Sequence, residues 1–545
     1  MLHNLYSDEA FIQVVSKVLE PGSPEDREVQ SKIMGDYDVL VRCFRKYMAF
    51  PAAVTPLPSN QESLLFRALS RVLEEVRFGM DRARPEALRA WAQAQDLIIE
   101  RARSGGVDNG LIFRLLKLFQ WAQVTPSLEL KAVLSETFKG VGKFALRRED
   151  ISESSESLAS FRLMLKSLAK EARGNSISLY LETIGLFAFL SDEISALFAS
   201  AFVQSDIDIF RDTGILALLN PSLTVRESVL SALNADLMNM NSTNMRRLAL
   251  IRPWLDSSRD RDNVAMLLED AHQRGLKPEA KKPARMDWLY ISILDGSGCQ
   301  GVSASSLQGK SGSIYTVLSK IGFGIRSGIY ETGLSQRDLE LNERHMKRRS
   351  QPISQEFVDA FVCNALAESH AAGNAIPVEF VGVAEAFGAT NWRPNASIAV
   401  PLREKLLTLT SQADIEGAIR RTELIARDER FATWFEDGAF IDEALALDMN
   451  KKPNAQAGTK AISESLLEGK LEERRERWQK MFFWSAASDA FSKKPKETGW
   501  EDRFLVAEAL RAGKPLKEIP FFVNMALFSV SQATMRMASA SMRSH

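Results

Sequence analysis

The amino-acid sequence changes character once, between Trp288 and Leu339. Nine of the thirty glycines of the chain lie in this stretch, together with many Ser, Ile, Val and Tyr residues. Glycine accepts the positive φ angles that tight turns need, and β-branched and aromatic residues favour strands. The sequence on both sides of the stretch is patterned as helix instead. We therefore predict a small glycine-rich β module between two helical arms.

The β module contains alternating strand and turn signals. Strand character is found in residues 288–294, 302–307, 314–320 and 325–330. Asp295-Gly296 and the run Gly309-Lys310-Ser311-Gly312 supply the residues that tight turns between strands prefer. Periodicity alone leaves 314–320 open between a third strand and a short helix. We predict a small antiparallel meander.

The N-terminal arm, residues 1–280, shows a succession of helix signals. Ser59 and Glu62 have the spacing of a capping box, in which each side chain satisfies a free backbone N–H of the other. An apolar stripe at helical spacing follows and consists of Leu65, Leu69, Val72 and Val76. This arm is therefore expected to be built from antiparallel helices.

One part of this arm is similar to a known repeat. The turn Asn220–Arg226, with Pro221 and then Val225, is followed by Val229, Ala232 and Leu233. Thr224 and Glu227 have capping-box spacing. The segment resembles the second helix of a HEAT repeat, which would imply an α-solenoid with a concave binding surface. No strict period runs through the arm, so we predict a mainly α fold built as an irregular helical stack, with a HEAT-like α-solenoid as the finer alternative.

Domain boundaries follow from composition. Residues 275–285, GLKPEAKKPAR, combine two prolines with basic residues, which is typical of an exposed linker. We predict an N-terminal arm at 1–280, the β module at 281–340 and a C-terminal helical arm at 341–545. In the last arm, the aromatic run from Trp478 to Trp484 is interpreted as core, with a partner-binding anchor as the alternative.

Composition narrows the classes of function. Lys and Arg number 69 and Asp and Glu number 70, so the chain has no global attraction for nucleic acid or an anionic membrane. The three cysteines and five histidines are scattered, and their spacing indicates neither a disulfide framework nor a zinc site. The apolar windows 177–190 and 521–530 are shorter than the roughly 18 residues of a membrane span. We expect a cytoplasmic protein without membrane contact, cofactor or metal.

Two patterns in the β module concern nucleotide binding. Residues 304–311 satisfy the loose pattern of a phosphate loop, in which Lys310 would reach phosphates and Ser311 would bind Mg²⁺. Asp295, in the Asp-Gly-Ser-Gly run, is a candidate for holding a metal or a phosphate. The residues before the pattern make a poor buried strand, so ordinary β-turns are the favoured interpretation of both patterns.

The densest basic cluster of the chain lies just after the β module. It consists of Arg344, Lys347, Arg348 and Arg349. Grouped cations can contact nucleic-acid phosphates. The cluster lacks interleaved aromatic residues and stands beside Glu340 and Glu343, so a solvated helix face is the favoured interpretation.

Three functions remain open. The first is a helical protein–protein interaction or scaffold protein whose partner is another protein, and the missing catalytic signatures favour it over an enzyme. The second is an enzyme or nucleotide-binding protein with its site in or beside residues 288–340. The third is a nucleic-acid binder that uses the cluster at 344–349.

Overall fold

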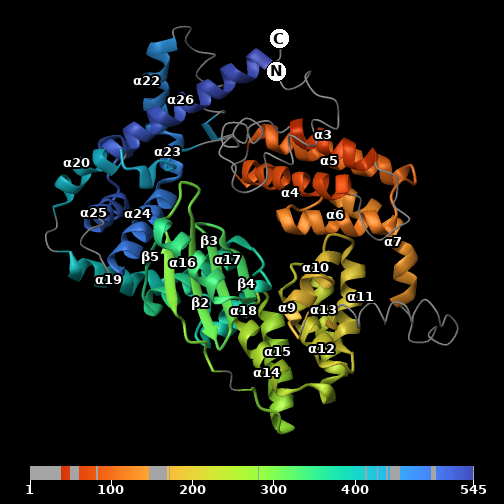
Figure 1. The fold of residues 1–545 in the computed structure, drawn as a ribbon. Coiled ribbons are helices and arrows are strands. Elements are labelled where there is room, and N and C mark those ends of the chain that lie inside the picture. Colours follow the sequence, from red (N-terminus) through yellow and green to blue (C-terminus); the bar gives the residue numbers. More distant parts are fainter. Residues whose placement is uncertain are drawn as a thin grey trace. The chain divides into compact units, whose positions relative to one another are not determined.

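The computed structural model describes residues 38–49, 60–81, 84–145, 169, 170, 172, 174–279, 282–410, 414–425, 427–436, 440, 441, 455–492 and 499–543 (Figure 1). The chain divides into two compact units, Met1–Asn239 and Met240–His545. The described residues are mainly helical and include one small antiparallel sheet, as predicted. None of the described helices is long and apolar enough to span a bilayer.

The described part of the first unit is helical. Its elements are α3 (Asp38–Ala49), α4 (Asn60–Asp81), α5 (Pro85–Arg103), α6 (Asn109–Ala122), α7 (Leu128–Ala145), α9 (Ser176–Leu181), α10 (Ile184–Phe187), α11 (Asp192–Val203), α12 (Asp208–Leu216), η3 (Ala217–Leu219), α13 (Leu223–Ala235) and η4 (Leu237–Asn239). Helix α4 buries Leu69, Val72 and Val76 of the predicted stripe. The predicted cap Ser59 lies outside the described residues.

Helix α13 corrects one prediction of detail. The helix begins at Leu223, so Thr224 lies inside it and does not cap it. The cause is the preceding turn, in which the Asn220 side chain accepts a hydrogen bond from the backbone N–H of Ser222. Arg226 then donates to the carbonyl oxygens of Asn220 and Pro221 at 2.9 and 2.7 Å. These contacts start the helix one residue before the predicted cap.

The second unit is organised around a five-stranded antiparallel sheet. Its strands are β1 (Trp288–Ser292), β2 (Cys299–Gln308), β3 (Ser311–Lys320), β4 (Gly324–Leu334) and β5 (Ser350–Pro352), in the order β4-β3-β2-β1-β5. Strands β1 to β4 form the predicted meander, and residues 314–320 are a strand. Gly309 has a φ of 63° in the turn between β2 and β3. Such a turn needs a residue without a Cβ penalty.

The fifth strand was not predicted, and its position explains the path of the chain. Helix α16 (Gln336–Arg349) leaves β4 at one edge of the sheet and enters β5 at the other edge. A helix of this length spans about 21 Å. Four steps between neighbouring strands cover about 19 Å. The helix is therefore just long enough to cross the sheet.

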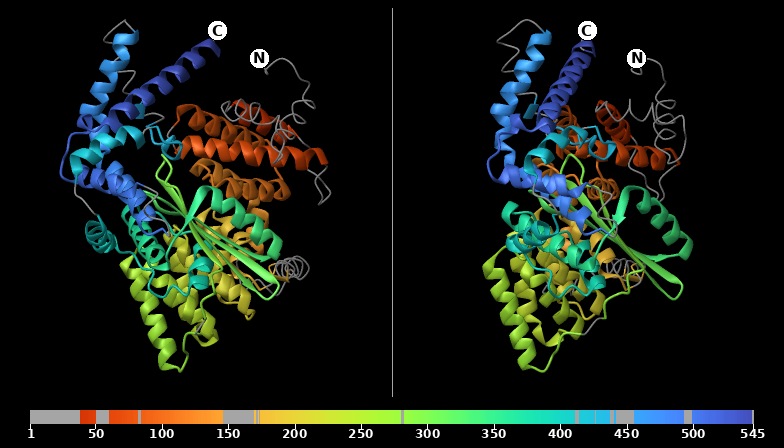
Figure 2. Two further views of the ribbon diagram at one scale, coloured as in Figure 1. Left: turned by 60° about the vertical axis from the view of Figure 1, so that its left-hand side comes forward. Right: turned by 90° about the vertical axis from the view of Figure 1, so that its left-hand side faces the viewer.

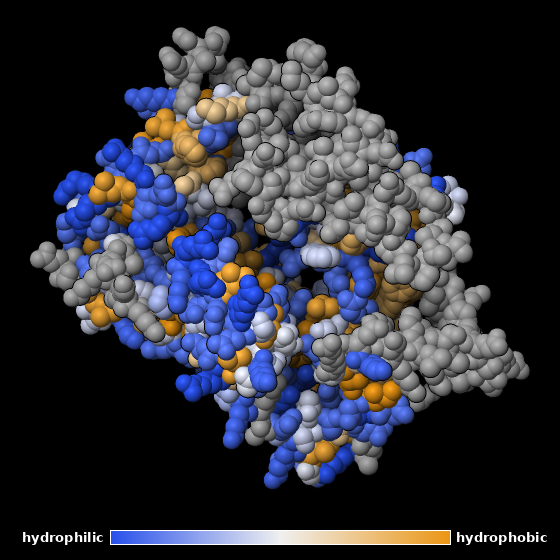
Figure 3. Space-filling model, in the orientation of Figure 1, coloured by the Kyte–Doolittle hydropathy of each residue, from blue (hydrophilic) through white to orange (hydrophobic). Residues whose placement is uncertain are grey.

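The sheet lies between α16 on one face and α17 (Gln355–Ala372) with α18 (Glu379–Phe387) on the other (Figure 2). A Cβ at Gly312 would meet Leu339 of α16, whereas the ring of Tyr315 lies against Phe387 of α18. These two β3 positions point to opposite faces because side chains alternate along a strand. In the orientation of Figure 1, hydrophilic residues cover the region of α16 (Figure 3).

Further helices complete the second unit. They are α14 (Ser242–Ile251), η5 (Arg252–Trp254), α15 (Ser258–Gln273), η6 (Ala396–Ile398), α19 (Ala399–Leu409), α20 (Ile415–Ile425), η7 (Glu429–Phe431), α22 (Ala455–Glu468), α23 (Lys470–Glu473), α24 (Arg475–Ala490), α25 (Trp500–Arg511), η9 (Leu516–Glu518) and α26 (Pro520–Arg543). The rings of Trp434, Trp478 and Phe521 pack together, with centroids 5.8–6.0 Å apart. Trp478 and Trp484 are buried, which confirms their interpretation as core.

The predicted boundaries at residues 280 and 340 stay predictions. The linker that motivated the first of them, 275–285, follows α15 and precedes β1. Residues 280 and 281 lie outside the described part of the chain.

Candidate functional site

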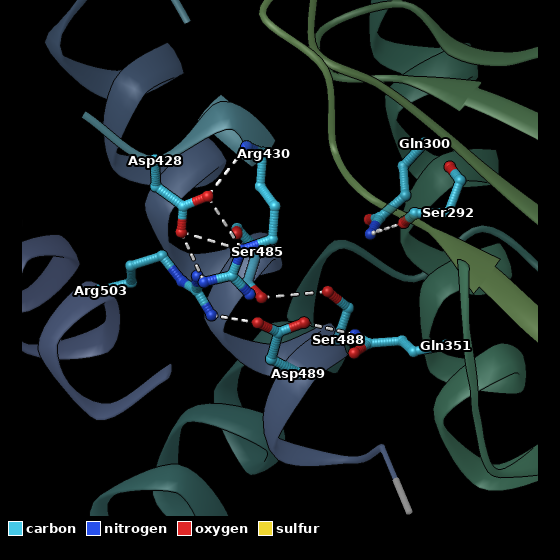
Figure 4. Close-up of polar contacts among 9 residues, drawn as sticks. All are labelled: Ser292, Gln300, Gln351, Asp428, Arg430, Ser485, Ser488, Asp489 and Arg503. Atoms are coloured by element: carbon cyan, nitrogen blue, oxygen red, sulfur yellow. Dashed lines mark hydrogen bonds and ion pairs between the residues drawn. The ribbon is translucent and has the colours of Figure 1, made fainter. Parts of the chain in front are cut away.

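The candidate site lies where the edge strand β5 meets helices α24 and α25 (Figure 4). Gln351 of β5 donates a hydrogen bond from Nε2 to Oδ1 of Asp489, at the end of α24. A backbone bridge between Ile353 and Ser492 joins the same two segments. The sheet edge and the C-terminal helices are thus connected by polar contacts within one compact unit.

Arg503 is the most deeply buried cation of this site. It comes from α25, and only 2% of its surface is exposed. Its Nη2 donates to Oδ2 of Asp489, and its guanidinium lies 5.1 Å from the ring centroid of Phe431. Burial lowers the pKa of Arg503, and the charge of Asp489 opposes that shift. The buried charge therefore depends on this carboxylate.

A second arginine–carboxylate pair stands beside the first. Arg430 of η7 donates from Nε and Nη2 to Oδ2 of Asp428 at 2.9 and 2.7 Å, and its backbone N–H donates to Oδ1 at 2.9 Å. Partial burial acts to raise the pKa of Asp428, but the hydrogen bonds and charge of Arg430 outweigh it, and the pKa is lowered. The two pairs together hold two positive and two negative charges.

The sheet contributes polar groups of its own to this interior. Gln300 of β2 is 2% exposed and donates from Nε2 to the carbonyl oxygen of Ser292 at 3.0 Å. The Ser292 hydroxyl accepts from the backbone N–H of Gly301 at 2.8 Å. In Figure 4, Gln300 and Ser292 lie on the sheet side, apart from the arginine pairs. Oε1 of Gln300 and Nε of Arg503 have no hydrogen-bond partner among the described protein atoms.

A further buried carboxylate fixes the turn between β1 and β2. Glu436, 3% exposed, accepts from Arg474 at 2.5 Å, Arg477 at 3.2 Å and Nε1 of Trp478 at 2.9 Å. Arg477 also donates to the carbonyl oxygen of Gly296 at 2.7 Å. Burial lowers the pKa of Arg477, and the charge of Glu436 opposes that shift. The turn is thereby tied to α24.

The chemistry available here is that of paired charges. A serine nucleophile needs a base within hydrogen-bond reach. The Ser488 hydroxyl instead donates to the carbonyl oxygen of Ser485 at 3.0 Å. Among the residues that the structure describes, no group of three His, Cys, Asp or Glu side chains is placed to hold a metal ion. The arrangement joins the sheet to the helices through paired charges and hydrogen bonds.

Asp295, one of the predicted nucleotide-site residues, lies in the turn between β1 and β2. Its Oδ1 accepts from the backbone N–H of Cys299 at 2.8 Å and from the hydroxyl of Ser297 at 2.7 Å. Its backbone carbonyl accepts from the N–H of Gly298 at 3.0 Å. These are the contacts of a turn-forming aspartate, the favoured interpretation from the sequence.

Lys310 and Ser311 lie at the turn between β2 and β3, and both are exposed. Gln308 pairs with Ser311 across this turn. A phosphate loop joins a buried strand to the start of a helix. Residues 304–311 join two antiparallel strands instead, because the segment after the turn continues as β3. The structure does not bring Asp295 and Lys310 together in any contact that it shows.

The basic residues Arg344, Lys347, Arg348 and Arg349 lie in the second half of α16, and all four are exposed. Lys347 forms an ion pair with Glu343 at 2.8 Å. The cluster is thus a surface feature on the face of the sheet opposite α17 and α18. It lies outside the arginine site described above.

The residues of the arginine site were missed from the sequence. Asp428, Arg430, Asp489 and Arg503 are spread over 76 positions, and no local spacing connects them. One signal was available: at helical spacing Arg503 shares one face with the apolar residues Trp500, Ala507 and Leu510. A charge at a position with buried neighbours predicts a buried partner.

Comparisons with known proteins give two partial matches. Residues 398–534 match a family model described as Y4lR C-terminal helical domain, and residues 191–275 match one described as Y4lR second domain. Together the matches cover less than half of the chain. No curated protein and no solved structure matches the chain. The segment similar to the Y4lR C-terminal helical domain contains both arginine–carboxylate pairs of the candidate site.

Proposed function

We propose that this chain is a cytoplasmic interaction or scaffold protein that binds another protein through helix α19. The observation that carries the proposal is a pair of exposed apolar side chains on a helix that is attached to the rest of its unit. Val400 and Leu407 of α19 are 53% and 44% exposed. They are seven residues apart and so lie on one face of the helix.

Helix α19 is attached to the rest of the unit by both packing and charge. Leu402 and Leu406 are buried. Arg403 forms a bidentate pair with Glu508 of α25 at 2.8 and 2.6 Å. Lys405 pairs with Glu356 of α17 at 3.1 Å. A helix fixed in this way presents its outer face already ordered, which lowers the entropy cost of binding.

Two further exposed apolar residues lie in this part of the chain. Leu409, at the end of α19, is 50% exposed, and Leu424 of α20 is 64% exposed. Single exposed apolar residues are normal on protein surfaces, so the pair on one face of α19 is what supports an interface. All four residues lie in the segment similar to the Y4lR C-terminal helical domain.

The first unit fits a scaffold role as a stack of helices. Helix α11 contacts both α12 and α13, and α5 contacts α3, α4 and α7. A HEAT-like arrangement is part of the proposal, and it would offer a second extended surface. A reducing compartment is consistent with the free cysteines Cys43, Cys299 and Cys363.

The test is site-specific cross-linking. A photo-reactive residue at Leu407 is expected to capture a defined protein in the native cell, and the same group at Met266, which is 59% exposed on α15, is not. The variant Val400→Glu/Leu407→Glu should lose that protein in affinity purification. The matched variant Leu223→Glu/Met266→Glu, also at exposed positions, should keep it. Equal capture from both positions, or only a cross-linked dimer of this chain, would refute the proposal.

A further inference from the structure

Helix α16 presents a line of arginines to solvent. Leu339 packs against the sheet, and Glu343 accepts a hydrogen bond from the Tyr290 hydroxyl at 3.4 Å, so this side of the helix faces the strands. Arg337, Arg344 and Arg348 are separated by seven and four residues. With 3.6 residues per turn they share one face, opposite Leu339. All three side chains are exposed.

The carboxylates of α16 are engaged elsewhere. Asp338 caps the helix start by accepting from the backbone N–H and hydroxyl of Ser335 at 3.0 and 2.6 Å. Glu340 accepts from the Gln336 amide at 3.0 Å. Glu343 pairs with Lys347. Each of these carboxylates thus has its hydrogen bond or ion pair with a group other than the three arginines.

The three arginines have no ion-pair partner among the described residues. The contacts that the structure gives them are to backbone oxygens: Nε of Arg344 donates to Glu340 at 3.3 Å, and Nε of Arg348 donates to Arg344 at 3.5 Å. The Nη groups of Arg344 and Arg348 therefore project free of carboxylates. Three guanidinium groups that form no ion pair with the described residues lie on one helix face, and they make it locally positive on a chain with a net charge of −1.

Helix electrostatics explains only part of this pattern. Cations near the last turn of a helix are stabilised by its dipole, which accounts for Lys347, Arg348 and Arg349. Arg337 lies in the first turn, where the dipole disfavours a cation. Its alignment with Arg344 and Arg348 points to an external anion that all three contact.

We propose that the α16 face formed by Arg337, Arg344 and Arg348 binds the phosphate backbone of double-stranded nucleic acid without reading its sequence. Along the helix axis the arginines are separated by about 10.5 and 6 Å. Each arginine can contact a separate phosphate, because a duplex carries one negative charge per about 1.7 Å of its axis. Arginine forks bind phosphate oxygens in bidentate geometry.

The same face argues against a single strand as the ligand. Proteins that hold single strands place aromatic side chains between their cations, on which the bases stack. Helix α16 contains no aromatic residue. Its outer face also carries Leu341, 60% exposed, and the exposed Glu340. Contacts to a duplex backbone need no stacking surface. This inference does not depend on the protein-binding role proposed for α19.

The test measures binding of the full chain to a labelled 20-base-pair duplex by fluorescence anisotropy over a range of salt concentrations. Three phosphate contacts predict a slope of log affinity against log salt near −2.7, so that affinity falls about 40-fold between 50 and 200 mM salt. The variant Arg337→Gln/Arg344→Gln/Arg348→Gln should lose this slope and the binding. The control Arg71→Gln/Arg103→Gln/Arg427→Gln removes the same charge from arginines that are exposed but ion-paired, and it should bind like the wild type.

A DNA and an RNA duplex are expected to bind alike, because both present a phosphate backbone. No complex at 50 mM salt, or equal binding by the triple variant, would overturn the inference. Equal affinity for a single-stranded oligonucleotide would remove the duplex as the ligand. Binding to phosphatidylserine vesicles without binding to the duplex would assign the face to membranes instead.

Discussion

Arg503 and Asp489 form a buried ion pair between α25 and α24, and Gln351 of the edge strand β5 donates to the same carboxylate. One side chain, Asp489, thus receives hydrogen bonds from a helix and from the sheet. Gln351 donates to Oδ1 and Arg503 to Oδ2 of Asp489, so removing one partner leaves a different carboxylate oxygen unpaired in each case.

Replacing one member of this pair is expected to be costly. Arg503→Met strands the Asp489 carboxylate in a largely buried position, and we expect the free energy of unfolding to fall by about 3–5 kcal/mol. Urea unfolding followed by tryptophan fluorescence measures it. Arg427→Met, at an exposed ion pair whose arginine side chain is 73% exposed, should cost under about 1 kcal/mol. A double variant, Arg503→Met/Asp489→Leu, should recover part of the loss, and no recovery would contradict this account.

The pair Arg430–Asp428 predicts a dependence of stability on pH. The folded-state pKa of Asp428 is lowered, so its contribution is fully present above the unfolded value of about 3.9 and is lost as pH falls through the folded pKa. The difference in unfolding free energy between the wild type and Asp428→Asn should therefore shrink on acidification below about pH 4. Denaturation series from pH 7 to 3 measure it, with Glu429→Gln as the neighbouring control. A difference that stays constant with pH would count against the pair.

Two glycines of the β module should respond differently to the same substitution. A Cβ at Gly296 would lie 1.5 Å from the carbonyl oxygen of Thr433, so Gly296→Ala requires the backbone to move and should cost more than about 2 kcal/mol. Gly309 has no atom within 4 Å of its Cβ position, and Gly309→Ala pays only for the positive φ, about 1–2 kcal/mol. Chemical denaturation of both variants compares them. A larger loss at Gly309 would show that Gly296 is not closely packed.

Glu436 is expected to hold the β1–β2 turn in place. Glu436→Gln removes the negative charge that pairs with the buried Arg477 guanidinium. We therefore expect the free energy of unfolding to fall by about 3 kcal/mol. Hydrogen exchange of the backbone amides at Gly296 and Cys299 should become faster, because the turn loses its attachment to α24. Unchanged protection of these amides, with the fold intact, would refute this role.

The meander could be predicted because its signals are local. Asp295-Gly296 and Gly309-Lys310 mark turns that the structure contains, and the apolar and β-branched segments between them are strands. Strand β5 could not be predicted in the same way. It has three residues, one of them Pro352, and its pairing partner β1 lies about 60 positions earlier. Proline is tolerated there because an edge strand has a side without a hydrogen-bonding neighbour.

The candidate site was beyond prediction for a related reason. Asp489 meets Arg503 across a helix pair, and Gln351 reaches them from the sheet, so the site exists only after the elements have packed. The sequence did single out Arg344–Arg349, but it could not show that Glu340 and Glu343 are occupied by other partners. That distribution of partners depends on the positions of Gln336, Tyr290 and Lys347 in three dimensions.

The crossing of the sheet by α16 has a mechanical consequence. Its first residues follow the edge strand β4 and its last residue precedes the edge strand β5, so the helix connects the two edges of the sheet. A force on α16 therefore acts on both edge strands at once. Gln351 lies two residues after the last residue of α16. Any load on the outer surface of α16 is therefore transmitted through two residues of backbone and the Gln351–Asp489 hydrogen bond to the Asp489–Arg503 pair.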